Sequence, residues 1–454
     1  MTTPVVPPVR LLPSWAWWLL VLPACLGVAV LTTMSVQLAA SAVAVACVVG
    51  VYLASRTAGI AGMWLLWLLL PAVRRMFGIS EGFESANPLA AAPFAATGIV
   101  AALELSRARL GPRAKRILFL AGAGFVFGVP LGILAAPDAA AFALVAYLAA
   151  ICSFAIGYRE PRDRPLVLVL VLAVAAAPIA IYAVLQILAP LTQWDQVWLD
   201  SVRFSSIGDK EDGTLRAFGT LNAPGTLAVV LGLAVVCLLS AMRLNVVQVA
   251  ALLAVLAGLA LTLARGVWVS LAFALIVLLA LAPRQVGRRV LVVGAVAVVC
   301  VPLFVAGNPA STTVADRAST FTALGDDRSA NARIATPQNI VPVAVREPLG
   351  LGIGQAGEAS RLGDNYVLRA TDNAFLSVLL QAGPVGLVLV LSAVALGVSS
   401  AVRNVRRRKA PNDLAVLGCV ALLGALMVTA DAFYGVSGVA LWYMLGYAVK
   451  GDGG

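Results

Sequence analysis

Two arginines lie where apolar blocks of the sequence meet short polar stretches, and a positive charge in such a place can bind an anion near the membrane surface. Arg265 lies in Leu-Ala-Arg-Gly between two apolar blocks, and Arg216 opens the stretch Arg-Ala-Phe-Gly-Thr-Leu-Asn-Ala-Pro-Gly. A guanidinium group binds the oxygens of phosphate in a bidentate manner. Both side chains are therefore candidates for contacting an anion, and the alternative for Arg265 is a snorkelling or acid-paired side chain.

Asn222 stands near the end of the Arg216 stretch, where a polar loop turns into the next apolar block. A helix that begins here would direct free backbone N–H groups and the positive end of its dipole toward a bound anion. Asn222 is accordingly a candidate substrate-binding residue. An ordinary helix entry accounts for the same residues equally well.

A second group of candidates lies further along the chain. Gly350 and Gly352 belong to Glu-Pro-Leu-Gly-Leu-Gly-Ile-Gly, where glycine at every second position permits close approach of the backbone. Asp372 and Asn373 place an acid and an amide at the start of a long apolar block. The Asp372 carboxylate can cap a helix and still face a cavity, so capping and chemistry are compatible.

The polar stretch 307–372 carries further arginines: Arg317, Arg328, Arg333, Arg346, Arg361 and Arg369. The sequence contains no histidine, which excludes a histidine base and any histidine-ligated metal site. Its six cysteines all fall within apolar blocks and have no metal-like spacing, so they are interpreted as small apolar side chains. We expect neither a metal nor a cofactor.

The elements that position these residues follow from the composition. Hydrophobic residues make up 61% of the 454 residues and charged residues only 12%, against about 25% charged residues in a soluble domain. The apolar residues form long blocks, and 165–194 and 217–242 contain no charged residue. About 20 apolar residues span a bilayer, where the backbone must form helices. The sequence predicts an all-α polytopic membrane protein with about 12–14 transmembrane helices and one large outer loop.

Fourteen spans are expected, or twelve if 58–73 and 88–105 lie at the interface instead of crossing. The expected spans are 15–33, 36–54, 58–73, 88–105, 117–136, 139–157, 165–190, 219–242, 247–263, 266–283, 290–306, 373–402, 413–430 and 433–449.

The net charge of +11 is interpreted as a signal of membrane topology and not of nucleic-acid binding, because the basic residues lie mostly in short loops between the expected spans. Basic loops near 107–116, 159–164, 284–289 and 403–409 are each separated by an even number of spans, so all four are expected in the cytoplasm with both termini. The outer segments are then 191–218 and 307–372. We therefore divide the chain into transmembrane helices at 1–306, a large outer loop at 307–372, and C-terminal helices at 373–454.

The order and spacing of these motifs resemble the O-antigen ligase and polysaccharide polymerase superfamily, Wzy-type membrane glycosyltransferases of GT-C-like architecture. The resemblance extends over about 216–386. The motifs that carry it are Arg216, Gly219 and Asn222-Ala-Pro224; Ala264-Arg265-Gly266; Arg333; Pro348-Leu-Gly350-Leu-Gly352; Asp372-Asn373; and Gly383-Pro-Val-Gly386.

The resemblance implies transfer of a glycan from an undecaprenyl diphosphate carrier on the periplasmic face of the bacterial inner membrane, without a metal. By analogy, Arg216 and Arg265 would hold the diphosphate and stabilise its developing charge, with Arg333 or Arg346 assisting. Ligase-type members have His-Asn where this chain has Asp372-Asn373. Asp372 is therefore the candidate base that accepts the proton of the acceptor hydroxyl.

The Asp-Asn pair favours a polymerase of lipid-linked oligosaccharide repeat units, as for O-antigen or exopolysaccharide. The first alternative is a ligase that transfers glycan to lipid A core, protein or another acceptor. The second is a polysaccharide transporter or flippase, which the scarcity of ionisable residues in the expected spans disfavours. Expected partners are the lipid bilayer, the undecaprenyl diphosphate-linked oligosaccharide, a flippase and a chain-length regulator.

Overall fold

The structure is a computed structural model that describes residues 36–81, 87–201, 207–208, 214–241, 245–306, 338, 340–362, 371 and 373–450. Within these residues the regular elements are helices, and none of these residues lies in a strand. In chain order the elements are α2 (Val36–Ala54), α3 (Arg56–Glu81), η1 (Pro88–Ala90), α4 (Ala92–Arg107), α5 (Pro112–Val126), α6 (Gly128–Ala135), α7 (Pro137–Arg159), α8 (Val167–Leu188), α9 (Gln193–Ser201), α10 (Pro224–Ala241), α11 (Val246–Leu261), α12 (Arg265–Leu281), α13 (Arg284–Ala306), η3 (Glu358–Leu362), α16 (Ala374–Arg408), α17 (Pro411–Leu426) and α18 (Gly435–Val449).

The predicted all-α polytopic membrane fold is confirmed. Among the described residues, seven helical stretches are long and apolar enough to cross a membrane, and five further apolar helices have 10–17 residues. The two segments for which the sequence left an interfacial alternative lie within such stretches, 56–79 and 88–107. The first expected span, 15–33, lies outside the described residues, as do 307–337 and 363–370 of the expected outer loop.

Proline and glycine set the limits of several helices. Proline occupies one of the first two positions of α4, α5, α7 and α17, where its missing N–H costs no helical hydrogen bond. Inside α16 the helix is kinked at Gly383, which has φ +70°, directly before Pro384. A Cβ at Gly383 would lie 2.2 Å from the Pro348 carbonyl oxygen, so the kink accommodates the backbone of the glycine-rich segment.

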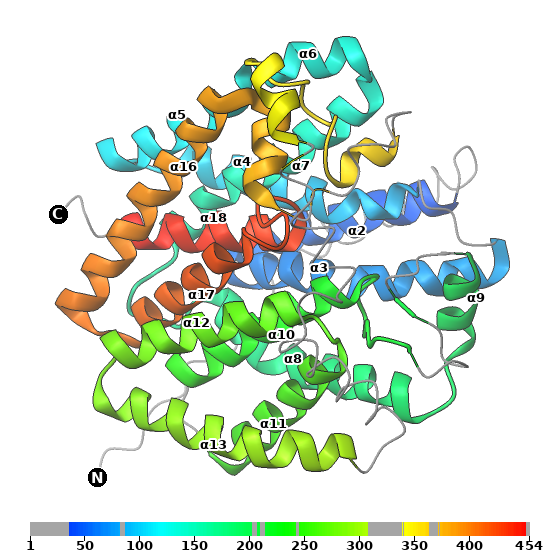
Figure 1. The fold of residues 1–454 in the computed structure, drawn as a ribbon, viewed down its shortest axis with the longest axis vertical. Coiled ribbons are helices and arrows are strands. Elements are labelled where there is room, and N and C mark those ends of the chain that lie inside the picture. Colours follow the sequence, from blue (N-terminus) through cyan, green and yellow to red (C-terminus); the bar gives the residue numbers. More distant parts are fainter. Residues whose placement is uncertain are drawn as a thin grey trace.

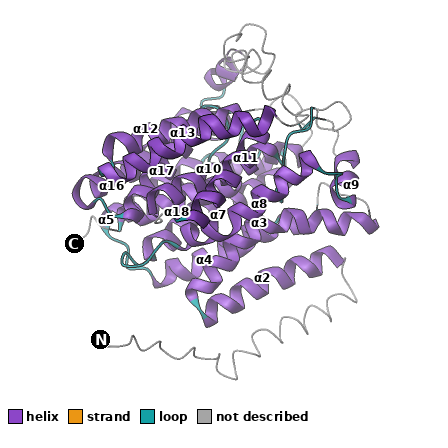
Figure 2. Ribbon diagram, turned by 90° about the horizontal axis from the view of Figure 1, so that it is seen from below, coloured by secondary structure: helices purple, strands orange, loops and turns teal. Residues whose placement is uncertain are grey.

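Most of the long helices run side by side, with α18 and α3 in the middle of the array (Figure 1). The helices α5 and α6 lie on one flank and α11 and α13 on the other (Figure 1). Seen from below, α12 and α13 lie along one side of the molecule and α2 along the other (Figure 2). Close packing of α7 on α18 depends on Gly157 and Gly446, whose Cβ atoms would lie within 2.0 Å of backbone oxygens of the other helix. Small residues allow this approach in membrane helices, where packing replaces the hydrophobic effect.

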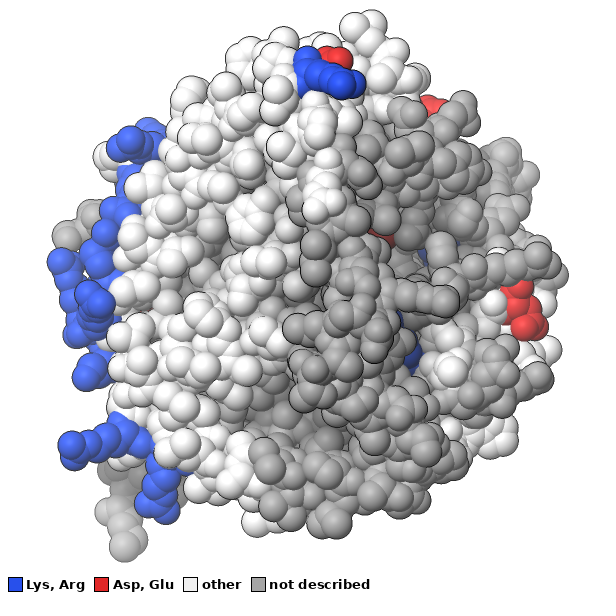
Figure 3. Space-filling model, viewed as in Figure 1, with Lys and Arg blue, Asp and Glu red and all other residues white. Residues whose placement is uncertain are grey.

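The charged side chains divide the molecule into two ends. Lys and Arg gather along the edge toward which the end of α18 points (Figures 1 and 3). Near this edge the fully buried Glu104 pairs with Arg56 and Arg159, each at 2.7 Å. Right of the centre of the same face, blue and red atoms are visible in a hollow, and red atoms lie near the right-hand edge (Figure 3). The distribution agrees with the four basic loops sharing one side.

Candidate functional site

Arg216 and Arg265 come from separate motifs and meet at the turn between α11 and α12. The Arg216 Nε donates a hydrogen bond to the Thr262 carbonyl at 2.9 Å, and the Ala217 amide donates to the Leu261 carbonyl at 3.0 Å. Leu263 has φ +53°, which makes the turn tight enough for Arg265 to be the first residue of α12. Both arginines are half-buried.

The start of α12 combines a helix N-terminus with a charged side chain. Its N-cap residue, Ala264, provides no side-chain hydrogen bond to the first turn, and backbone N–H groups at such a position attract anions. A Cβ at Gly266 would lie 2.6 Å from the Thr429 Oγ1. Glycine at this position therefore lets the turn between α17 and α18, residues 427–434, lie directly against the start of α12.

The α17–α18 turn also contacts the start of α16. The Asn373 Nδ2 donates to the Val428 carbonyl at 3.1 Å, and the Ala374 amide donates to the Met427 carbonyl at 2.9 Å. The Asn373 Oδ1 meanwhile caps α16 by accepting from two backbone amides of its first turn. Asn373 thus has a structural role at this junction, and its neighbour Asp372 lies outside the described residues.

The α17–α18 turn contains a buried carboxyl group that the sequence reasoning missed. The Ser377 hydroxyl donates to the Asp431 Oδ2 at 2.8 Å, and the Phe433 amide donates to Oδ1 at 3.1 Å. Burial raises the pKa of Asp431 to about 6, although these two hydrogen bonds stabilise its ionised form and limit the rise. A carboxyl with this pKa is largely ionised at neutral pH and can still accept and release a proton.

A hydrogen-bond network connects Asp431 to the glycine-rich segment. The Gln381 Nε2 donates to the Tyr147 hydroxyl at 3.0 Å and to the Ser377 Oγ at 3.0 Å, while its Oε1 accepts from the Gly354 amide at 2.8 Å. We call Tyr147, Ser377, Gln381 and Asp431 the Asp431 cluster. Its signal in the sequence was an acid in a short hairpin between two apolar blocks, the same kind of signal that singled out Arg265.

Gly350 and Gly352 lie where the backbone of the glycine-rich segment packs against helices. A Cβ at Gly350 would lie 2.7 Å from the Gly383 nitrogen in α16, and one at Gly352 would lie 2.2 Å from the Gly132 nitrogen in α6. Both have positive φ angles, 82° and 104°. Close approach of the backbone, which the spacing predicted, is therefore present between parts of the chain itself.

A buried network behind the Arg216 stretch holds that stretch in place. The Arg75 side chain is fully buried, and its NH2 and NH1 donate to the carbonyls of Gly219 and Leu221 at 2.6 and 3.1 Å. Its Nε lies 3.1 Å from the Asp195 Oδ1. The Gln186 side chain donates to Asp195 and accepts from the Gly219 amide, each at 2.8 Å. This network, Arg75, Gln186 and Asp195, was also missed from the sequence.

The other candidates differ in their surroundings. The Asn222 Oδ1 is buried and has no hydrogen-bond partner within the described part of the chain, so it can receive a hydrogen bond from a ligand. Arg346 is exposed at the end of the helical stretch 340–346, and Arg333 lies outside the described residues. Among the residues that the structure describes, no group of acids and cysteines is placed to hold a metal ion.

The chain matches a known protein family over the elements that form this site. Residues 249–391 match the family model described as O-antigen ligase, and this range includes Arg265, the glycine-rich segment and the start of α16. No curated protein and no solved structure matches the chain. The O-antigen ligase match at 249–391 supports the resemblance to the O-antigen ligase and polysaccharide polymerase superfamily and indicates glycosyl transfer as the general activity.

Proposed function

We propose that this protein polymerises undecaprenyl diphosphate-linked oligosaccharide repeat units on the periplasmic face of the bacterial inner membrane. One observation carries the proposal. The α17–α18 turn touches the start of α12 at Gly266, holds Asn373, and carries Asp431. Arg216 binds the adjoining α11–α12 turn. A cationic helix start and a titratable carboxyl, joined by a single turn, supply both of the charges that the transfer requires.

In the proposed reaction, the acceptor hydroxyl oxygen attacks the anomeric carbon of the donor sugar. The bond from that carbon to the diphosphate oxygen breaks, and the lipid diphosphate leaves with the bonding electrons. Arg216, Arg265 and the N–H groups at the start of α12 stabilise the negative charge that develops on the leaving group. The Asn222 side-chain amide forms a hydrogen bond with the same substrate.

A carboxylate takes the hydroxyl proton in this scheme. Asp372 is the base that the family resemblance implies, and Asp431 is the one whose surroundings support proton transfer near neutral pH. The structure describes Asp431 alone of the two. We assign the proton to Asp431, which lies in the same α17–α18 turn that binds Asn373, and Asp372 is the alternative base that the resemblance implies.

The second candidate function is ligation of a finished glycan to lipid A core, protein or another acceptor. It is favoured by the family description, O-antigen ligase, whereas Asp372-Asn373 in place of His-Asn favours polymerisation. The gathering of Lys and Arg at one edge supports a cytoplasmic location for that edge (Figure 3), and both termini are proposed to lie in the cytoplasm. A flippase and a chain-length regulator are the proposed protein partners.

The test is deletion of the gene in its host, followed by analysis of surface and lipid-linked glycans. The strain is complemented with wild type, Arg216→Ala, Arg265→Ala, Asp372→Asn and Asp431→Asn, with Arg284→Ala at the basic edge as the matched control. Polymerisation predicts single repeat units on the carrier and rescue only by wild type and the control. Full-length polymer retained on the carrier would assign the ligase function instead. Unchanged glycans would refute both functions.

A further inference from the structure

Residues 218–221 are held from one side by the buried network that α3, α8 and α9 form. The Arg75 side chain of α3 donates to the Gly219 carbonyl at 2.6 Å and to the Leu221 carbonyl at 3.1 Å. The Gln186 Oε1 of α8 accepts a hydrogen bond from the Gly219 amide at 2.8 Å. These backbone groups, which face α3 and α8, are therefore fixed in direction.

The amide groups on the other side of the same peptides are left for another partner. Both peptide bonds are trans, so each N–H points opposite to the C=O of its peptide. Because Arg75 holds the Gly219 and Leu221 carbonyls, the N–H groups of the next residues, Thr220 and Asn222, point away from Arg75. Within the described residues neither N–H donates a hydrogen bond, and the buried Asn222 Oδ1 accepts none. A buried polar atom normally has a partner, so this side of the stretch is suited to a ligand.

Arg75 itself is enclosed and does not contact a ligand. Its side chain is fully buried, and its Nε lies 3.1 Å from the Asp195 Oδ1, whose charge offsets its own. Its Cζ lies 4.9 Å from the centre of the Phe218 ring and 5.3 Å from that of the Trp198 ring. Any effect of Arg75 on a substrate therefore passes through the backbone that it holds.

We propose that Arg75 is a positioning residue of the glycosyl transfer, an inference that rests on the proposed function. The two carbonyls that it holds direct the Thr220 and Asn222 N–H groups at the oxygens of the lipid diphosphate, in the same stretch as Arg216. Negative charge on those oxygens grows as the bond to the anomeric carbon breaks. Donors that are already fixed in direction stabilise this charge without having to reorganise.

Arg75→Lys tests the inference, because lysine keeps the positive charge beside Asp195 but lacks the planar fork that reaches both carbonyls and the carboxylate. The full-length protein in proteoliposomes is given lipid-linked repeat units, and kcat and KM are measured well below the melting temperature, where each variant is folded. We expect kcat to fall about 100-fold with KM nearly unchanged, because the misplaced donors act mainly in the transition state.

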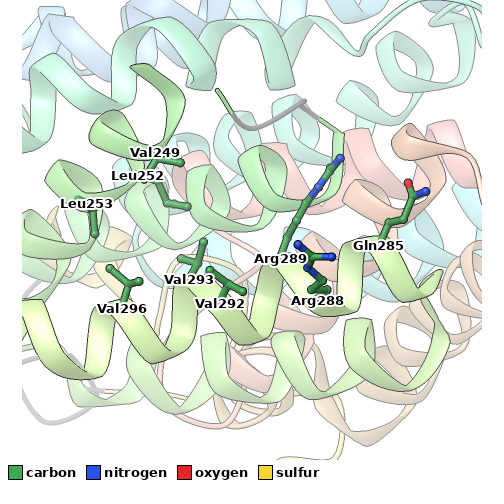
Figure 4. A pocket seen from close by; sticks show the side chains of 9 residues that line it. All are labelled: Val249, Leu252, Leu253, Gln285, Arg288, Arg289, Val292, Val293 and Val296. Carbon is green, nitrogen blue, oxygen red and sulfur yellow. The ribbon is translucent and has the colours of Figure 1, made fainter. Parts of the chain in front are cut away.

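Arg162→Lys is the matched control. The Arg162 side chain lies 3.3 Å from the Asp413 carboxylate, donates to the Tyr447 carbonyl at 3.3 Å and lies 5.0 Å from the Tyr447 ring, so it makes the same three kinds of contact as Arg75. Arg288→Lys is a second control, since Arg288 lines a cavity of about 420 Å³ between α11 and α13 that shares no residue with the network (Figure 4). Both variants are expected to leave kcat unchanged.

A double variant tests whether Arg75 acts through the stretch that it holds. The loss of kcat in Arg75→Lys is expected to be about tenfold smaller when Asn222 is already alanine, because the two changes then remove one shared contact. Thr220→Val keeps the buried ion pair but loses the hydrogen bond from the Thr220 hydroxyl to the Leu68 carbonyl at 2.7 Å. We expect kcat to fall in Thr220→Val and to be retained in Thr220→Ser, which keeps a hydroxyl.

A fall of kcat in Arg75→Lys and Thr220→Val, reduced when Asn222 is alanine and absent from both controls, supports the inference. A fall of the melting temperature alone, an equal fall of kcat in Arg162→Lys, or independent effects of Arg75 and Asn222 would overturn it, because Arg75 would then be a purely structural anchor. If Arg75→Lys does not fold, the contrast between Thr220→Val and Thr220→Ser decides. A wild-type protein that joins no repeat units would refute the proposed function and this inference together, whereas an active wild type with a fully active Arg75→Lys refutes the inference alone.

Discussion

Replacing Ser377 by alanine removes one of the hydrogen bonds that stabilise the ionised form of Asp431. The Ser377 Oγ lies 2.8 Å from the carboxylate, and the Phe433 amide and the Tyr147 hydroxyl also stabilise the ionised form. A hydrogen bond to a charged group contributes about 1.5–3 kcal/mol, and one pKa unit corresponds to about 1.4 kcal/mol. From its value of about 6 in the wild type, the pKa of Asp431 is therefore expected to rise by about 1–2 units in Ser377→Ala.

This rise has a measurable consequence if Asp431 accepts the proton of the acceptor hydroxyl. The ascending limb of kcat/KM against pH then reports this pKa. At pH 7 the ionised fraction falls from about 90% to between about 50% and 10%, so Ser377→Ala loses about two- to tenfold of its activity. Activity returns as the pH is raised to 9. The assay follows the joining of lipid-linked repeat units by purified protein in proteoliposomes.

Ser437→Ala provides the matched control. Ser437 lies in the first turn of α18, and its hydroxyl donates a hydrogen bond to the Tyr434 carbonyl at 2.7 Å instead of to Asp431. It is expected to leave the pH profile unchanged. If Ser377→Ala lowers the rate equally at every pH, or if the wild-type profile has no ascending limb near pH 6, Asp431 is not the base in the proposed reaction.

Four further predictions follow from the same contacts. Because the pKa of Asp431 is raised from 3.8 to about 6, the buried carboxyl lowers the stability of the protein as the pH rises through this range. Asp431→Asn is therefore expected to be more stable than wild type by up to about 3 kcal/mol at pH 7 but not at pH 3, and to lose activity. Thermal unfolding at the two pH values measures the difference. Arg265→Lys keeps the charge but loses the bidentate fork, and kcat/KM is expected to fall about tenfold or more, with Arg284→Lys unchanged. Gly266→Ala places a Cβ 2.6 Å from the Thr429 Oγ1, so activity is expected to fall and to recover in the double variant with Thr429→Ala; failure of that rescue would contradict the contact. Arg75→Met leaves the buried Asp195 without its cation, so the melting temperature is expected to fall by several degrees, with a loss of about 3 kcal/mol or more.

Much of the fold could be predicted from the chain alone because a bilayer permits few solutions. Apolar blocks of about 20 residues must be helices when no water is present to satisfy the backbone. From residue 36 on, each expected span therefore falls on described helical residues. The span 117–136 is divided between two helices, α5 and α6, and 58–73 and 88–105 extend as 56–79 and 88–107. The spacing of the basic loops likewise predicted that they share one side, and Lys and Arg gather along one edge of the molecule (Figure 3). These features depend only on local composition.

The two arginines were recognisable for a related reason. A charge placed between two apolar blocks is costly and needs an explanation, so Arg216 and Arg265 stood out in a sequence with 12% charged residues. Asp431 offered the same signal. It was missed because burial, which raises its pKa, follows from how the helices pack and is not visible in a sequence.

Sequence by itself determined the class of fold, the positions of the helices and the order of the motifs, because each follows from residues close together in the chain. Tertiary structure alone decided which motifs share a site. Asp431 reaches Ser377 from 54 residues away, and Arg75 reaches Gly219 from 144 residues away. Such contacts depend on how helices pack, and the small residues that permit the packing, such as Gly266 against Thr429, carry no chemistry of their own.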